Sequence, residues 1–268
     1  MAMRVAVSGK GGVGKTTVAA ILSRLFGRDG NRVLAIDIDP SPTLASALGV
    51  PKDVKAGIVP LSRMLDLIEE RTGVRPGSSY GSLFKLNPKV DDLADRYGIA
   101  AKDGVTLLVL GTIETGASGC FCPENALIRR LVKHLVLKRD EILVMDMEAG
   151  VEHLGRGTAE GVDVLLVIVE PGMRSIETAR SIKALARDVG IERIAAVLNK
   201  SRGAEDENFA RDHLKEFCIE MIGALPYSDC VIRADLDGIS PVDLEECAPI
   251  IESLSSVKER LLNFRAGE

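Results

Sequence analysis

The chain has 268 residues, 46% of them hydrophobic, which is enough to bury the core of one sizeable domain. Its 34 basic and 39 acidic residues give a net charge of −5 without a lysine- or arginine-rich run, so the charge pattern typical of nucleic-acid binding is missing. No apolar run approaches the roughly 20 residues that cross a bilayer, and the sequence has no recognisable export signal. We therefore expect one soluble, cytoplasmic domain over residues 1–268 that binds neither nucleic acid nor a membrane.

The first elements in chain order predict a phosphate-binding unit. Residues 3–8 are a β-branched run typical of a strand, and residues 17–26 carry apolar side chains at helical spacing. Between them, residues 9–16 match the pattern G-x-x-x-x-G-K-[ST] at every fixed position. A strand, a glycine-rich turn and a helix N-terminus direct backbone N–H groups and the positive end of the helix dipole at one point. The sequence therefore predicts a polyphosphate site.

The side chains of this loop indicate how ATP or ADP would be held. Lys15 is expected to neutralise the β- and γ-phosphates, and the Thr16 hydroxyl to ligate Mg²⁺. Lys10 is a second lysine in a loop whose pattern requires one. The residues expected to surround the phosphates are Gly9, Lys10, Gly11, Gly12, Val13, Gly14, Lys15, Thr16 and Thr17.

Apolar runs alternate with amphipathic stretches along the rest of the chain. The runs are nearly continuous in Val, Ile and Leu, as is typical of strands buried on both faces. We predict an α/β fold, a doubly wound and mostly parallel sheet with helices on both faces, whose functional site lies at the carboxyl ends of the strands. The predicted strands after the first are residues 32–37, 105–110, 141–146, 163–169, 194–198 and 221–225.

Three other segments carry predictions. Residues 51–103 are too long for a simple connection, so we expect an insertion near the site with a helix over residues 61–70. Residues 175–189 have a helical apolar pattern and are followed by Gly190, which predicts a crossover helix with a glycine cap. The C-terminal end, around residues 243–264, is expected to be helical and to dock on the core.

Acidic residues follow two of the predicted strands. Asp37 and Asp39 end one strand, and Asp146 ends another. A carboxylate at this edge can hold Mg²⁺ through a water molecule or orient the attacking water. A role as a turn or capping residue is the alternative for each, and it is nearly as strong as a functional role for Asp37.

A C-x-C pair precedes another predicted helix. Cys120 and Cys122 come just before residues 126–136, and Pro123 suits the first turn of that helix. In an extended segment both sulfurs face the same way, and a helix N-terminus lowers the pKa of a thiol. Two thiolates are half of a tetrahedral site, which a homodimer would complete with the same pair from its second copy. The alternative is that both are small buried apolar residues.

The other cysteines give no such signal. The total of five is odd, and without an export signal it argues against a disulfide framework. Cys218, Cys230 and Cys247 lack metal-ligand spacing, so we interpret them as reduced thiols in the core or on the surface.

The stretch with two lysines, residues 10–16, resembles the deviant Walker A motif of the MinD/ParA/nitrogenase-iron-protein group of dimerising ATPases. The resemblance implies a homodimer in which Lys10 reaches the nucleotide of the partner. It also implies that Asp39 polarises the hydrolytic water and that Asp146 is the Walker B aspartate. In the second switch, the N–H of Gly150 would sense the γ-phosphate.

The same resemblance assigns the base-binding end of the site. Asn199 follows the strand predicted over residues 194–198, where members of the group read the adenine edge with an asparagine amide. Pro226 lies in a segment that resembles the loop covering the base. An ordinary turn residue is the alternative for Asn199.

Three stretches, residues 87–92, 116–126 and 146–153, resemble the CooC-type nickel-insertion ATPases that mature carbon monoxide dehydrogenase. The resemblance extends from Met3 to about Tyr227. It implies an ATP-dependent metallochaperone that carries Ni²⁺ or Zn²⁺ on its C-x-C motif, with carbon monoxide dehydrogenase or the acetyl-CoA synthase complex as client. His153 would lie in the second switch, where an imidazole could serve the metal or the switch itself.

Two alternatives belong to other functional classes. A spatial regulator of the MinD/ParA type would need a basic DNA-binding face or a strong membrane helix, and the sequence has neither. An electron-transfer protein like the nitrogenase iron protein shares one iron–sulfur cluster between subunits, but its ligands lie in separate loops, whereas Cys120 and Cys122 lie in one.

Overall fold

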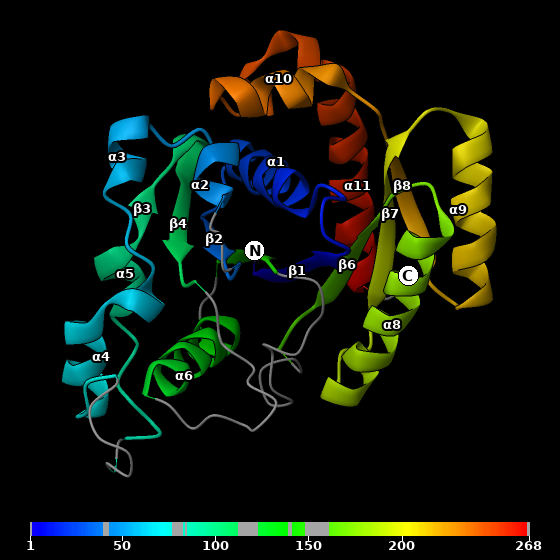
Figure 1. Cartoon of the computed structure of the whole chain (residues 1–268). Helices are drawn as coiled ribbons and strands as arrows, with labels where there is room; N and C mark the ends of the chain where they lie inside the picture. The colour runs from blue at the N-terminus through cyan, green and yellow to red at the C-terminus, as the bar shows by residue number, and fades with distance from the viewer. Residues whose placement is uncertain are drawn as a thin grey trace.

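A computed structural model describes residues 2–39, 43–76, 83, 85–111, 123–138, 141–147 and 161–266 (Figure 1). Its centre is an eight-stranded sheet in the order β3-β4-β2-β5-β1-β6-β7-β8. All paired neighbours are parallel except β3 and β4, which are antiparallel. The strands are β1 (Met3–Gly9), β2 (Val33–Asp37), β3 (Ile99–Ala100), β4 (Val105–Val109), β5 (Ile142–Asp146), β6 (Val164–Val169), β7 (Ile194–Ser201) and β8 (Glu220–Pro226).

Helices cover both faces of the sheet, which confirms the predicted fold class (Figure 1). One core cluster joins the sheet to α4, α5, α6, α8 and α9, and the other joins it to α1, α2, α10 and α11. The α-helices are α1 (Lys15–Arg28), α2 (Leu44–Ala47), α3 (Lys52–Ala56), α4 (Leu65–Thr72), α5 (Leu93–Tyr97), α6 (Pro123–Lys138), α8 (Met173–Val189), α9 (Ala204–Glu216), α10 (Asp229–Asp237) and α11 (Ala248–Ala266). The 3-10 turns are η1 (Leu61–Arg63), η2 (Lys102–Gly104), η3 (Pro241–Asp243) and η4 (Glu245–Cys247).

Every strand predicted from an apolar run is present, with ends shifted by no more than a few residues. The short antiparallel strand β3 was not predicted, because two residues carry no periodic signal. Helix α8 ends at Gly190, whose φ of 94° is the left-handed cap expected of glycine. Helix α11 docks on the core as predicted, with Val257 and Leu261 buried.

The helix predicted over residues 61–70 is wrong in its extent. The chain forms η1, breaks at Met64 with φ −83° and ψ 80°, and only then enters α4. The apolar spacing runs through this break, so periodicity alone did not reveal it. Residues 51–103 contain α3, η1, α4, α5, β3 and η2. No helix in the described part of the chain is long and apolar enough to cross a membrane.

The prediction of reduced thiols at Cys230 and Cys247 is also wrong. The two form a disulfide between α10 and η4, with their Cα atoms 5.7 Å apart. They are 17 residues apart in sequence, and only the packing of η3, η4 and α10 against one another brings them together. Cys218 is an exposed free thiol, in agreement with its prediction.

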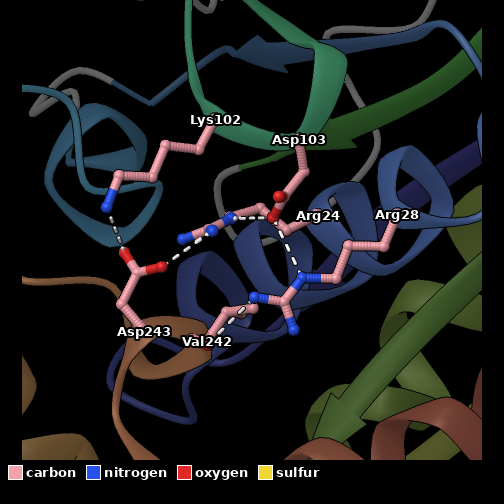
Figure 2. Close-up of polar contacts among 6 residues, drawn as sticks. All are labelled: Arg24, Arg28, Lys102, Asp103, Val242 and Asp243. Carbon is pink, nitrogen blue, oxygen red and sulfur yellow. Dashed lines mark hydrogen bonds and ion pairs between the residues drawn. The ribbon is translucent and has the colours of Figure 1, made fainter.

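The carboxyl-terminal half of α1 is anchored by buried charge (Figure 2). Arg24 is 1% exposed, and its guanidinium donates to Asp103 at 2.7 Å and to Asp243 at 2.8 Å. Arg28 adds bonds to Asp103 and to the Val242 carbonyl, each at 3.1 Å. The network ties α1 to the turn before β4 and to η3. The hydrogen bond from Arg24 also lowers the pKa of the Asp243 carboxyl below its usual value.

Candidate nucleotide site

The phosphate loop leaves β1 through glycines that no other residue could replace without strain. Gly9, Gly12 and Gly14 have φ values of 151°, 80° and 95°. A Cβ on Gly9 would run into the carbonyl oxygen of Ile168 in β6, and one on Gly14 into the side-chain amide of Asn199. The loop therefore lies tightly between the ends of its neighbouring strands. Helix α1 begins at once, with no side-chain cap at Gly14, so its first N–H groups face the loop.

The two lysines of the loop occupy different environments. Lys15 is 9% exposed, and its amine donates to the carbonyl of Lys10 at 3.4 Å across the loop. Lys10 has a partly exposed side chain whose amine lies 3.9 Å from the carboxylate of Glu170 at the end of β6. Lys15 therefore lies inside the loop, where bound phosphates would be, whereas Lys10 lies at its rim.

Residues of β7 support the loop from the side. The Asn199 amide donates to the Val13 carbonyl at 2.7 Å, and its oxygen accepts the N–H of Lys200 at 2.9 Å. The Lys200 amine donates to the Gly12 carbonyl at 2.7 Å. Asn199 thus holds the phosphate loop, a contact that the sequence did not predict. Its role toward adenine stays a prediction.

Three acidic residues end the neighbouring strands β2 and β5. Asp37 and Asp146 lie side by side in the sheet register. Asp37 is fully buried, and its carboxylate accepts the N–H groups of Asp39 at 3.1 Å and Leu44 at 3.0 Å. Burial raises the pKa of Asp37 to about 6, against the opposing effect of these bonds. Asp37 therefore fixes the turn that carries the half-buried Asp39.

Asp146 is the least satisfied of the three. It is 1% exposed, and within the described residues neither carboxylate oxygen accepts a hydrogen bond of normal geometry. Burial raises its pKa to about 7, and the nearby Thr16 hydroxyl and Lys15 charge oppose this rise. An orphaned buried carboxylate beside a threonine hydroxyl fits Mg²⁺, which prefers oxygen ligands and keeps several waters. Thr16 and Asp146 are the residues that would hold it, and the ion would neutralise phosphate charge.

A cavity of about 440 Å³ opens beside the loop. Polar groups from the loop and β7 line one side, and apolar groups of α10 and α11 line the other, which suits a nucleoside with its base and ribose. Pro226 is in the lining, and its contact with the base stays a prediction, whereas the contribution of α10 was not predicted. The lining residues are Gly12, Gly14, Thr16, Thr17, Val18, Thr43, Ala47, Asn199, Lys200, Pro226, Tyr227, Ser228, Val231, Ile232, Asp235 and Ile250.

The predicted metal ligands Cys120 and Cys122 lie outside the described residues, as do Gly150 and His153 of the predicted second switch. Helix α6, which begins at Pro123 directly after the C-x-C pair, is present as predicted. Within the described part of the chain, no group of three or more His, Cys, Asp or Glu residues is arranged to hold a metal ion.

The fold and the loop together define a phosphate-loop nucleotide-binding protein. The model of the CobQ/CobB/MinD/ParA nucleotide binding domain matches residues 5–242. An ATP-binding protein of Methanocaldococcus jannaschii is 47% identical over 97% of this chain and 99% of its own length. The carbon monoxide dehydrogenase accessory protein CooC of Rhodospirillum rubrum is 44% identical over 90% of each chain. The chain therefore belongs to the CobQ/CobB/MinD/ParA family of ATPases and, within it, to the CooC type, which confirms the resemblance found in the sequence.

Solved structures agree on the fold. The MinD cell division protein of Aquifex aeolicus superposes with a TM-score of 0.68 over 97% of both chains at 21% identity. MinD of Pyrococcus horikoshii, whose structure was solved as a complex with Mg-ADP, gives a TM-score of 0.68 at 19% identity, over 97% of this chain and 96% of its own. At this level of identity the likeness shows the architecture alone.

Proposed function

We propose that this ATPase is a metallochaperone that works as a homodimer and delivers a metal ion, nickel in the first place, to carbon monoxide dehydrogenase. The observation that carries the proposal is the 44% identity, over 90% of both chains, to the carbon monoxide dehydrogenase accessory protein of Rhodospirillum rubrum. The C-x-C pair supports it, because two thiolates from each of two copies complete a four-sulfur site. Zn²⁺ is the alternative cargo, and the acetyl-CoA synthase complex the alternative client.

In this proposal the nucleotide site works through residues of the phosphate loop and of the two predicted switches. Lys15 and the loop N–H groups bind the phosphates, and Asp39 positions the attacking water on its fixed turn. Lys10, at the rim, reaches the nucleotide of the second copy, which makes hydrolysis depend on dimer formation. Gly150 senses the γ-phosphate, while Asn199 and Pro226 contact adenine.

The core supplies a route from the nucleotide to the metal-bearing segment. Cys122 directly precedes α6, whose residues Leu127 and Leu131 are fully buried. They belong to the same core cluster as Met145 and Met147, which flank Asp146 in the chain. A shift of this strand end on nucleotide binding could reach the helix that follows the cysteines through this shared core.

A metal titration read out together with molar mass tests the proposal. Ni²⁺ and Zn²⁺ are each titrated anaerobically into the reduced full-length protein, with bound metal and mass measured on the same sample. Saturation is expected at one ion per dimer, and metal is expected to promote the dimer without nucleotide, because a ligand that binds only the dimer stabilises it by mass action.

The variant with Cys120→Ser and Cys122→Ser should lose both effects and still bind ATP. Cys218→Ser, which removes the exposed thiol of Cys218, is the matched control and should behave like the parent. Saturation at one ion per monomer, or tight metal binding by the double variant, would overturn the shared site.

A further inference from the structure

Lys200 has a backbone conformation that its residue type disfavours. Its φ is 60°, in the left-handed region, and it lies in β7 where the pairing register with β8 shifts between Leu198 and Ser201. A left-handed non-glycine residue of this kind costs free energy, and glycine would avoid the cost. Irregularities of this sort often re-aim a side chain near an active site. The side chain of Lys200 should therefore have a use that offsets the strain.

The side chain crosses from β7 to the phosphate loop. Its amine donates to the Gly12 carbonyl at 2.7 Å and lies 3.0 Å from a carboxylate oxygen of Glu170. Lys200 also lines the nucleotide cavity. The amine therefore holds a carbonyl of the loop in place while it adds positive charge beside the phosphate site.

Glu170 lies directly after β6, and a hydrogen bond fixes the position of its backbone. It follows the last residue of β6, and its backbone N–H donates to the hydroxyl of the buried Ser175 in α8 at 3.0 Å. Its carboxylate lies between two lysines, 3.0 Å from Lys200 and 3.9 Å from Lys10. The ends of β6 and β7 thus meet the phosphate loop through one chain of polar contacts.

We propose that Lys200 is a positioning residue for ATP binding, which holds the phosphate loop by the Gly12 carbonyl, and that Glu170 sets the place of its amine. The inference concerns the ATPase reaction of this family. It stands or falls independently of the metal and the client proposed above.

The variant Lys200→Gly separates positioning from folding. Glycine relieves the left-handed backbone, and this gain offsets the two lost polar contacts and the looser unfolded chain, so the melting temperature without nucleotide should stay close to that of the parent. The dissociation constant for ATP should nevertheless rise about tenfold, because the loop loses its anchor and a nearby positive charge. The KM for ATP should rise with it, while kcat at saturating ATP changes less than about twofold. Lys183→Met is the control, because the Lys183 amine also makes two polar contacts, with the carbonyls of Phe217 and Cys218, just before the start of β8 and so at the edge of the sheet opposite the phosphate loop.

A double-mutant cycle tests the part played by Glu170. Glu170→Gln is expected to weaken ATP binding in the parent and to have a much smaller effect in the Lys200→Gly background, because only the longer contact of Glu170 with Lys10 then remains. An unchanged ATP affinity in Lys200→Gly, or a loss of melting temperature along with the affinity, would overturn the positioning role. Equal effects of Glu170→Gln in both backgrounds would overturn the pairing.

Discussion

The two ends of α1 differ in whether a buried charge beside them is paired. Near its carboxyl end, the guanidinium of Arg24 is held by the carboxylates of Asp103 and Asp243 at 2.7 and 2.8 Å (Figure 2). Beside its amino end, the equally buried Asp146 has no hydrogen bond of normal geometry to any described residue, and the helix has no side-chain cap. At one end of the helix the buried charge is therefore paired with opposite charges of the protein, although one guanidinium nitrogen of Arg24 has no hydrogen bond, and at the other end the buried charge has no such ion pair.

The difference indicates where the protein is stabilised and where it is prepared for a ligand. A buried charge costs free energy unless it is paired, so the Arg24 network can anchor α1, whereas Asp146 destabilises the protein until a cation or a proton neutralises it. Buried carboxylates with raised pKa values cluster at functional sites. Substitutions at the two ends should accordingly change different quantities.

The largest effect is expected at the amino end. Lys15→Ala should lower kcat/KM for ATP by about 10³-fold, mainly through lost binding, because it removes the charge inside the phosphate loop. Asp39→Ala should keep ATP binding and lose most of the turnover, because it removes a group expected to position water. Equilibrium ATP binding and steady-state hydrolysis distinguish the two. Equal loss of binding in both variants would mean that Asp39 belongs to the phosphate cradle.

At the anchored end the expected change is in stability. Arg24→Ala removes a buried side chain and its hydrogen bonds to two carboxylates, which keep Arg28 and Lys102 as partners, and should cost about 2–4 kcal/mol of unfolding free energy. Arg75→Ala removes an exposed arginine that also pairs with two carboxylates, Asp66 and Glu69, and should leave the unfolding free energy almost unchanged, because water screens such surface pairs. Urea denaturation measures both. A cost for Arg24→Ala no larger than that of the control would show that the network does not anchor α1.

A smaller effect, with a characteristic pH dependence, is expected for Asp146→Asn. Burial raises the pKa of Asp146 in the folded protein to about 7, above the ordinary value for an aspartate, so the folded state binds its proton more tightly than the unfolded state. Above about pH 7 the ionised carboxylate therefore lowers the stability of the folded protein by its full amount. This penalty shrinks as the pH falls from about 7 towards the ordinary pKa of an aspartate. Without nucleotide or Mg²⁺, Asp146→Asn should be more stable than the parent by about 1–3 kcal/mol at pH 8 and by less at pH 5.

Asp212→Asn, at an exposed position of α9, is the matched control and should alter stability little at either pH. Urea denaturation at pH 8 and pH 5 measures the unfolding free energy of the parent and of both variants. A gain that is the same at pH 8 and pH 5 would mean that the charge of Asp146 is not the cause.

The sequence predicted the local parts of this site and missed the contacts between distant parts. The phosphate loop and the strands that end in Asp37 and Asp146 are visible because each depends on a short pattern. The support of the loop by Lys200 and Glu170 depends on β6 and β7 lying on one side of β1, and the order of strands is not encoded in any one segment. The disulfide of Cys230 and Cys247 was missed for the same reason.

The break at Met64 shows a different limit. The apolar pattern continues across the break in the backbone. The predicted helix therefore began at Leu61, whereas α4 begins at Leu65. Helices α6 and α8, whose ends coincide with Pro123 and Gly190, were predicted more accurately. Residues with a strong backbone preference therefore located helix ends better than apolar spacing did.

If the proposed metal on Cys120 and Cys122 is coupled to the nucleotide, reciprocal affinity measurements will reveal it. The dissociation constant of Ni²⁺ is measured with and without a non-hydrolysable ATP analogue, and that of the analogue with and without Ni²⁺. Each ligand should change the affinity of the other by the same factor, about 5- to 150-fold, and Cys120→Ser with Cys122→Ser should abolish the effect. Affinities that agree within twofold in the presence and absence of the other ligand would contradict it.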